Sequence, residues 1–347
     1  MGEIKKIDWI SKAKGFAILG IIAVHVAQQF ELPYVSRFLF SGQFCVQLFF
    51  IISAYLSFKS SKLQCVCIKG GYGKYLSLKF FRLAPVLYIS CLWWLIIECL
   101  KIRGIPSLRA AIWRDGLLAV TFLNGFSFHH INPWGNWYVG DLAIFLALAP
   151  FLKKMVNSLR SSLVLFVISV LVAYVSNYVL IKCGVDTGWY FYFWLPMQFP
   201  ALAVGIFFYY LETEESLESK KDVFYSFCFV VSLGFLLSKC GLNILEDHIQ
   251  YGILLFVFSY SLFSRKNRFL NWLNVLGDNS YGIYLYHLCL LPLIRSFVRS
   301  FGFDKNIINF ILCYFFAAIF SLLFSMITTH FVEKPLLRFV KTRFCLQ

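Results

Sequence analysis

Charged side chains are scarce in this sequence: Asp, Glu, Lys and Arg together make up 14% of its 347 residues. Soluble globular domains carry about 25% charged residues, so this low fraction argues against an ordinary soluble enzyme. Apolar residues take their place, because 60% of the residues are hydrophobic, 20% are aromatic and the mean hydropathy is +0.73. The same composition excludes a disordered chain and a fibrous repeat. It predicts a membrane protein that crosses the bilayer several times.

Other common patterns are also missing from the sequence. It has no internal repeat, no low-complexity tract, no heptad array and no small-residue cleavage site after its first apolar stretch, which we therefore interpret as a membrane span. Five of its 11 cysteines lie inside apolar runs: Cys91, Cys99, Cys228, Cys289 and Cys313. A thiol in such a run behaves as a small hydrophobic group. Cys65 and Cys67 have no second Cys/His pair nearby to complete a zinc site, so we expect neither a disulfide framework nor a metal site.

The excess of positive charge needs a separate explanation. Lys and Arg number 32 against 17 Asp and Glu, which gives a formal net charge of +15. Nucleic-acid binding would account for this charge, but the basic residues lie between long apolar runs. In that position they follow the positive-inside rule and contact the anionic cytoplasmic leaflet. We therefore predict membrane lipids, and no nucleic acid, among the partners.

Crossing about 30 Å of hydrocarbon takes roughly 17–25 helical residues, and ten apolar runs reach or approach this length. The predicted spans are 10–29, 38–58, 80–100, 136–152, 162–181, 190–210, 222–239, 249–264, 280–299 and 307–331. The stretch 109–128 is ambiguous because Arg109, Arg114 and Asp115 interrupt it. Counting it as a span would place the later basic clusters outside, against the positive-inside rule. We predict an all-α polytopic transmembrane helix bundle of about ten spans, with 101–135 as an external loop that holds a re-entrant or interfacial helix.

This topology has two consequences for the organisation of the chain. Both termini are expected to face the cytoplasm, because an even number of spans puts them on one side and the positive-inside rule assigns that side to the cytoplasm. Residues 1–347 form a single integral membrane domain, since no stretch has room for a separate soluble one.

An ionisable pair in the first span is the strongest functional signal. Lys14 and His25 are 11 residues apart, which at about 100° per residue amounts to three turns plus roughly 20°, so they share a helix face. Lys14 is expected near the cytoplasmic boundary and His25 about 16 Å further along the axis, near mid-membrane and lining the same hollow. Ionisable residues inside a span usually face the bundle interior and serve function. The spacing also fits a hydrogen-bonded core histidine and a lysine that extends to the interface.

A second basic cluster begins the third span. Lys79 and Arg82 are three residues apart and therefore neighbours on one helix face, on the same predicted side as Lys14. Ordinary positive-inside anchoring accounts for such residues. Together, the three cations could also bind a phosphorylated cofactor at the inner mouth of the bundle.

Weaker signals come from other polar residues in the spans. Ser53 is most simply explained by a hydroxyl bonded back to its own helix. An interfacial aromatic belt explains Trp137 and Tyr138 without a functional role. It does not explain Asp141, an acid in the same span. His287 fits a bonded core histidine and an active-site wall equally well.

In order, these motifs resemble those of the acyltransferase-3 family, the bacterial membrane O-acyltransferases, from about residue 7 to 340. The matching segments are Lys14 with His25, Phe49-Phe-Ile-Ile-Ser53, Lys79 and Arg82 before Pro85, Trp137-Tyr138 to Pro150, Ser280-Tyr-Gly-Ile-Tyr-Leu-Tyr-His287, and Glu333-Lys-Pro335. Lys14 and Lys79 stand where the family has Arg, which keeps the charge but loses bidentate phosphate geometry. Asp141 stands where Glu is usual.

The resemblance implies transfer of an acyl group, commonly acetyl, from cytoplasmic acyl-CoA to a hydroxyl of a cell-surface glycan or its lipid-linked precursor, in a bacterial inner membrane. Lys14, Lys79 and Arg82 would bind the phosphates of acetyl-CoA. His25 would act as general base or carry the acyl group transiently, since imidazole suits both tasks. Roles in substrate binding or support fall to the remaining motif residues: Ser53, Trp137, Tyr138, Asp141, Tyr281, His287 and Glu333.

A proton-coupled transporter is the main alternative. A relay of His25, Glu98, Asp141 and His287 could carry protons across the spans. Many transporters are built from repeats, and none is visible here. Binding of coenzyme A would distinguish the two functions.

Overall fold

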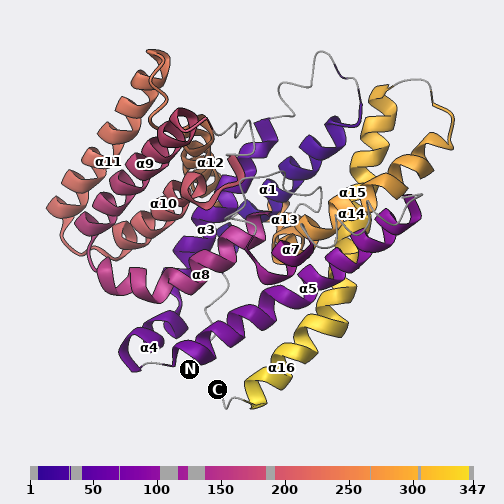
Figure 1. Ribbon diagram of the computed structural model, residues 1–347, viewed down its shortest axis with the longest axis horizontal. Helices are drawn as coiled ribbons and strands as arrows, with labels where there is room; N and C mark the ends of the chain where they lie inside the picture. The colour runs from indigo at the N-terminus through magenta and orange to yellow at the C-terminus, as the bar shows by residue number, and fades with distance from the viewer. Residues whose placement is uncertain are drawn as a thin grey trace.

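The computed structural model describes residues 7–30, 32, 41–69, 71–101, 116–123, 137–184, 192–265, 267–303 and 306–343. These residues form an all-α bundle in which no strand is found (Figure 1). Within the predicted external segment 101–135, the described part includes one short helix, α7 (Leu117–Thr121). Most of that segment, including both ends of the ambiguous stretch 109–128, lies outside the described residues.

Each of the ten predicted spans coincides with a helix. These helices are α1 (Asp8–Ala27), α3 (Cys45–Lys59, preceded by the 3-10 turn η1, Ser41–Phe44), α5 (Tyr72–Lys101), α8 (Trp137–Met155), α9 (Leu159–Lys182), α10 (Leu195–Thr213), α11 (Leu217–Lys239), α12 (Asp247–Phe263), α14 (Ser280–Arg299) and α15 (Asn306–Thr328). Seven helical segments in the described part of the chain are long and apolar enough to cross a membrane. The predicted fold class is confirmed: the chain is a multi-pass helix bundle.

Shorter helical segments lie between the spans or follow the last one. They are α4 (Ser61–Lys69), the 3-10 turn η5 (Arg268–Leu270), α13 (Trp272–Asp278), the π-helical turn η6 (Thr329–Glu333) and α16 (Lys334–Arg343). Side chains of neighbouring residues cap the first turn of some long helices. At α9, for example, the Ser158 hydroxyl accepts a hydrogen bond from the Ser161 backbone N–H, and the Ser161 hydroxyl accepts one from the Ser158 backbone N–H, which together form a capping box.

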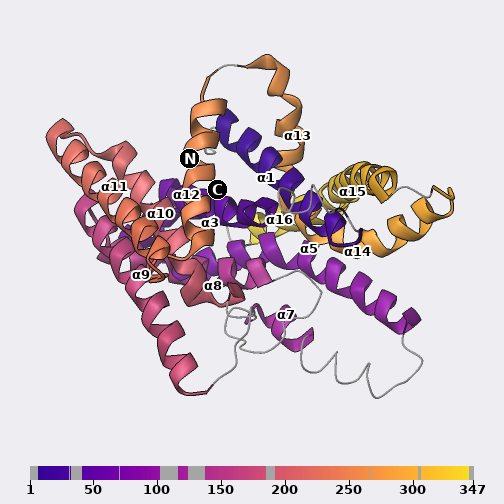
Figure 2. The same cartoon turned by 90° about the horizontal axis from the view of Figure 1, so that it is seen from above.

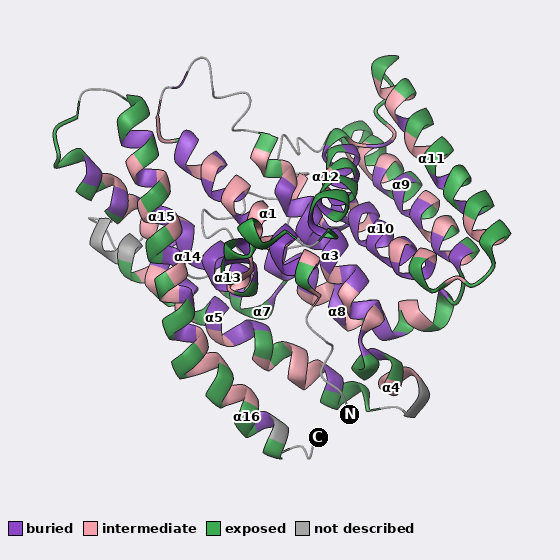
Figure 3. Cartoon of the chain, turned by 180° about the vertical axis from the view of Figure 1, so that it is seen from behind, coloured by how far each residue is buried: buried purple, intermediate pink, exposed green. Residues whose placement is uncertain are grey.

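Burial separates central helices from peripheral ones. In the most apolar window of α1 and of α3, 67% of the residues are buried, against 22% for α9 and 17% for α11. Figure 2 shows α9 and α11 at one edge of the molecule and α14 and α15 at the other, with α1 and α3 between them. Exposed residues follow the outer helices in Figure 3. Because these exposed residues are largely apolar, the outer helices present a lipid-compatible surface.

The two ends of the bundle differ in their residues. One end, here called the Lys14 side, holds the start of α1, the end of α3 and the start of α5, and α4 and α16 lie toward it in Figure 1. Lys59, at the end of α3, pairs there with Glu212 at 2.8 Å. The opposite end, here called the His25 side, holds the end of α1, where the Arg295 guanidinium donates to Gln29 Oε1 at 2.9 Å.

Helix α13 packs on α1 through backbone contact. A Cβ at Gly277 would lie 1.7 Å from the carbonyl oxygen of Ser11, and a Cβ at Gly15 would lie 2.1 Å from that of Leu273. Only glycine permits such an approach. The contact brings the end of α13 beside α1, where the Ser11 hydroxyl donates a hydrogen bond to Asp278 Oδ1 at 2.9 Å.

Replacing Gly277 with alanine is expected to destabilise the protein by about 1–3 kcal/mol, because the new methyl group forces α13 away from α1. Thermal unfolding in detergent should show a melting temperature several degrees below that of the wild type. Gly73→Ala is the matched control, since nothing lies within 4 Å of its Cβ position. Equal melting temperatures for Gly277→Ala and Gly73→Ala would show that the contact is not required.

Candidate functional site

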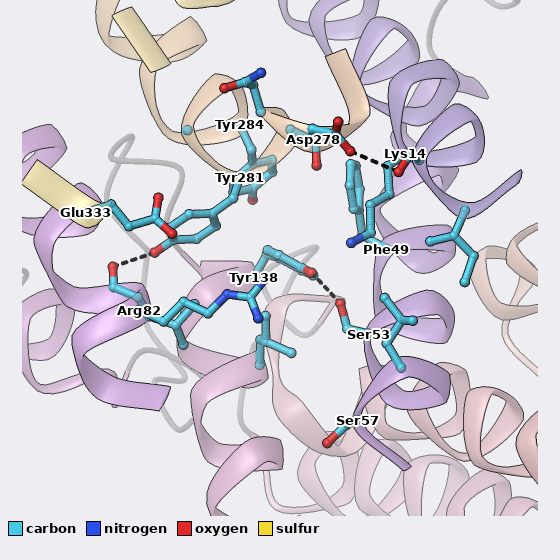
Figure 4. Close-up of a pocket in the computed structure, with 18 of the residues that line it drawn as sticks. Lys14, Phe49, Ser53, Ser57, Arg82, Tyr138, Asp278, Tyr281, Tyr284 and Glu333 are labelled. Atoms are coloured by element: carbon cyan, nitrogen blue, oxygen red, sulfur yellow. Dashed lines mark hydrogen bonds between the residues drawn. The ribbon is translucent and has the colours of Figure 1, made fainter. Parts of the chain in front are cut away.

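A cavity of about 460 Å³ lies on the Lys14 side of the bundle. Its walls come from α1, α3, α5, α8 and α14, with further residues from α13, α15 and η6. Figure 4 shows side chains from several of these helices converging on it. The volume falls within the range of small-molecule sites, and a position between helices is typical of them.

Three cations line this cavity: Lys14 from α1, and Lys79 and Arg82 from one face of α5. Lys79 also lies over the Tyr75 ring, with 5.3 Å from Nζ to the ring centroid. Among the described residues, no carboxylate lies within ion-pair distance of any of the three. Arg82 is exposed, and Lys14 and Lys79 are partly so. The cavity therefore presents positive charge that a ligand can approach.

Two acids share the cavity with these cations. Asp278 is held by Ser11, as described above, and Glu333 lies in the π-helical turn η6 at the end of α15. The hydroxyl of Thr329, on the same turn, donates to Glu333 Oε2 at 3.4 Å. In Figure 4 Glu333 and Arg82 lie on one side of the cavity, and Lys14 and Asp278 on the other. The site is thus mixed in charge, with one more cation than anion among the five groups.

Aromatic rings and hydroxyls form the wall furthest from the Lys14 side, here called the aromatic wall and made of Phe49, Tyr138 and Tyr284. Phe49 lies ten residues before the end of α3, which is about 15 Å along the helix. Ring centroids are 6.0 Å apart for Phe49 and Tyr138, and 5.2 Å apart for Tyr138 and Tyr284. The Tyr138 hydroxyl lies 3.1 Å from that of Ser53. Each of the three rings is at least 95% buried, so the wall closes the cavity at this end.

Tyr281, one helical turn before Tyr284, lies in the same cavity. Its hydroxyl donates to the backbone carbonyl of Leu83 at 2.7 Å. This bond joins α14 to α5 beside Arg82, so Tyr281 helps to fix the relative position of the two helices that carry charge and aromatic groups.

His25 lies beyond the aromatic wall and does not line the cavity. Helix α1 ends at Ala27, so His25 belongs to its last turn, on the His25 side. The hollow expected to be shared by Lys14 and His25 is therefore not this cavity, which Lys14 lines and His25 does not. The His25 ring instead faces that of His287, with centroids 5.2 Å apart. The ring centroids of Tyr284 and His287 are 5.9 Å apart, so Tyr284 lies between the aromatic wall and the two imidazoles.

Two further residues predicted for the site lie outside the cavity. Trp137 packs against Phe50, with ring centroids 5.9 Å apart, and against Phe193 at 5.1 Å. Asp141 is fully buried, and neither carboxylate oxygen has a hydrogen-bond partner among the described residues. The structure thus brings Ser53, Tyr138, Tyr281 and Glu333 together with the three cations, and leaves Trp137, Asp141, His25 and His287 behind the wall.

Sequence reasoning missed several residues that line the cavity. The position of Asp278 could have indicated a role in the site, because this acid lies two residues before the Ser280 motif, at the predicted cytoplasmic end of the span. Tyr284 follows Tyr281 by three residues and so shares its helix face. Phe49 belongs to the aromatic–serine segment, but nothing in its type separates it from an ordinary core residue.

This arrangement has a definite chemical capacity. Cations that have no carboxylate within ion-pair distance in the described part of the chain suit the phosphates of an anionic ligand, and Arg82 can bind one in bidentate fashion. The aromatic wall suits an uncharged group at the far end of that ligand. Among the described residues no group of three potential metal ligands occurs.

Comparison with protein-family models gives a match over most of the chain. The family model Acyl_transf_3, described as an acyltransferase domain, matches residues 7–330. A search of curated proteins and a search of solved structures each found no match. Since the family model spans nearly the whole chain, the protein belongs to the acyltransferase-3 family and is a membrane acyltransferase.

Proposed function

We propose that the protein is an O-acetyltransferase that moves an acetyl group from cytoplasmic acetyl-CoA to a hydroxyl of a surface polysaccharide, or of its lipid-linked precursor. The observation that carries this proposal is the cavity lined by Lys14, Lys79 and Arg82, with no carboxylate in ion-pair distance among the described residues. Coenzyme A carries several phosphates, and charge-assisted hydrogen bonds to them are about twice as strong as neutral ones.

The proposed orientation places the Lys14 side in the cytoplasm of a bacterial inner membrane, with both termini there. Basic residues outside the cavity support it, since Lys59, Lys153 and Lys334 lie at the ends of α3, α8 and α15–α16 that face this side. Such a distribution follows the positive-inside rule. Acetyl-CoA would then enter from the compartment in which it is made.

His25 is the proposed general base. Its Nδ1 lies 3.2 Å from Gln28 Oε1, and an amide oxygen only accepts, so Nδ1 carries the hydrogen and Nε2 the lone pair. Nε2 takes the proton of the acceptor hydroxyl while that oxygen attacks the thioester carbonyl carbon. The C–S bond breaks, the coenzyme A thiolate leaves, and His25 returns the proton to it. The products are the ester and the free thiol.

The aromatic wall is the reason for proposing a short acyl group on the donor. The thioester end of the donor must pass Tyr138 and Tyr284 to approach His25. Both rings are buried, and their centroids are 5.2 Å apart. A small movement of one ring would admit an acetyl group, whereas a long chain would require a much larger displacement of the wall.

The test supplies membranes that contain the protein and its natural acceptor with either labelled acetyl-CoA or labelled palmitoyl-CoA. Acetyl label is expected in the glycan fraction, with palmitoyl transfer at least tenfold slower. Membranes lacking the protein are the control. Equal transfer of both groups would contradict the short-chain assignment. No transfer, together with no stabilisation of the purified protein by coenzyme A, would favour the transporter alternative.

A further inference from the structure

Two arginines lie one turn apart on α14, at its end on the His25 side. Arg295 is partly buried and donates through Nη1 to Gln29 Oε1 on α1 at 2.9 Å, and Arg299 is the exposed last residue of the helix. Residues four apart share a helix face, so Arg299 lies on the face from which Arg295 extends to α1. In the described part of the chain, no carboxylate comes within ion-pair distance of either arginine.

The usual reasons for a cation at a helix end do not apply to Arg295. The positive-inside rule places cations on the cytoplasmic side, which is the Lys14 side in the proposed orientation. The helix dipole favours a cation in the last turn, where Arg299 lies. Arg295 precedes that turn and bonds to another helix, so it calls for a further explanation.

The hydrogen bonds of Arg295 leave part of its guanidinium unused. Its Nε is buried and has no partner among the described residues, and buried polar groups without a partner are uncommon. Nε and Nη2 form the edge of the guanidinium that faces away from Nη1, and such an edge binds two oxygens of a phosphate at once. Gln29 therefore holds the side chain through Nη1 and leaves this edge for another acceptor. Because Arg299 is exposed, an oxyanion can approach the pair.

The location of the two arginines connects them with His25. Gln29, which Arg295 contacts, follows His25 by four residues, about one helical turn. Arg295 itself follows His287, whose ring faces that of His25, by eight residues, or about 12 Å of helix. His25 is partly exposed, although it does not line the cavity on the Lys14 side. This exposure fits an acceptor that approaches from the His25 side while the donor occupies the cavity.

We propose that Arg295 and Arg299 bind the phosphate linker of a lipid-linked glycan, which makes the lipid-linked precursor, rather than the finished polysaccharide, the acceptor. This inference rests on the proposed function. The linker of such a glycan stays at the membrane surface because its lipid is in the bilayer, and the two arginines lie at the end of a helix long enough to cross it. The sugars next to the linker are then the ones that reach His25. An acidic sugar of a long polysaccharide has no fixed depth in the membrane and gives no reason for cations at this position.

Binding of farnesyl diphosphate to the purified protein in detergent tests the site without turnover. Saturating coenzyme A is present, so that the cavity on the Lys14 side does not contribute. The Kd is expected to rise about tenfold or more in Arg295→Gln and about three- to tenfold in Arg299→Gln, because each loses hydrogen bonds to a charged group. Arg295→Lys should lie between the wild type and Arg295→Gln, since it keeps the charge but loses the bidentate geometry. Farnesol, which has no phosphate, should bind all four proteins alike.

Lys239→Gln is the matched control. Lys239 is an exposed cation at the last residue of α11, at the same end of the bundle (Figure 1). This variant should bind farnesyl diphosphate as tightly as the wild type. If Arg295→Gln does not fold, Arg299→Gln carries the test, because Arg299 is exposed. Wild-type affinity in the folded arginine variants would overturn the proposal.

Competition identifies the oxyanion that the site takes. Inorganic diphosphate should displace farnesyl diphosphate from the wild type, whereas phosphatidylglycerol at the same phosphate concentration should leave it bound. Displacement by phosphatidylglycerol would indicate a general contact with lipid headgroups. Displacement by glucuronate but not by diphosphate would indicate a site for acidic sugars. Either result would overturn the assignment to a phosphate linker.

Acetyl transfer separates this inference from the proposed function. In membranes that contain lipid-linked glycans, the initial rate of labelling of the lipid-extractable glycan fraction should fall about tenfold in Arg295→Gln. The KM for acetyl-CoA should be unchanged. Arginine-dependent binding of farnesyl diphosphate without acetyl transfer would leave the site standing and remove the acetyltransferase function. Transfer that proceeds at the wild-type rate in Arg295→Gln and Arg299→Gln would keep the function and overturn the site.

Discussion

The His25→Ala variant is expected to transfer acetyl label about 10²–10⁴-fold more slowly than the wild type, the range that a positioned general acid or base contributes. A sugar hydroxyl is a poor nucleophile at neutral pH, and the substitution removes the base proposed to take its proton. Coenzyme A affinity should change less than twofold, because His25 lies behind the aromatic wall and outside the cavity that holds the cations. The measurement combines initial transfer rates in membranes with ligand binding to the purified protein.

The control for this prediction is His248→Ala, which removes another buried imidazole outside the cavity. It should retain most of the wild-type rate if its melting temperature is near that of the wild type. A folded His25→Ala protein with full activity would exclude His25 from catalysis.

A rapid acid quench of the wild type with labelled acetyl-CoA addresses the second role considered for His25. Label trapped on the protein, and absent from His25→Ala, would indicate an acyl-histidine intermediate. The absence of protein-bound label would favour direct transfer with His25 as base.

The sequence predicted the helices well because a membrane imposes a simple length rule. Every predicted span coincides with a helix, since about 20 apolar residues are needed to cross the hydrocarbon and few alternatives exist. The position of the cations at one end of the bundle was also predictable, because a charged residue at the end of an apolar run lies near the membrane surface. Lys14, Lys79 and Arg82 accordingly come together from helices that are distant in sequence.

Contacts between helices were not predictable in the same way. Periodicity gives the face of a helix but neither its partner nor the position of its end. Lys14 and His25 were predicted on one face of α1, yet only Lys14 lines the cavity, while the His25 ring lies beside that of His287 from α14. The close approach of α13 to α1 depends on backbone contact at Gly277, which no hydrophobic pattern reports. Asp278 enters the cavity through that contact.

Neutralising Arg82 is expected to have the largest effect on donor binding of any cavity substitution. Hydrogen bonds to charged groups contribute about 1.5–3 kcal/mol, and 1.4 kcal/mol corresponds to a tenfold change in affinity. Arg82→Met should therefore raise the Kd for coenzyme A about 10- to 100-fold. Arg82→Lys should have a smaller effect, since it keeps the charge but loses bidentate geometry.

Comparing two ligands shows whether the lost interaction involves phosphate. Pantetheine shares the thiol arm of coenzyme A but has no phosphate, so its affinity should be nearly the same in Arg82→Met and wild type. Arg338→Met is the matched control on the protein, because Arg338 is an exposed arginine of α16 that does not line the cavity. That variant should bind coenzyme A within twofold of the wild type. If Arg82→Met weakens pantetheine and coenzyme A equally, Arg82 supports the shape of the cavity and the phosphates bind elsewhere.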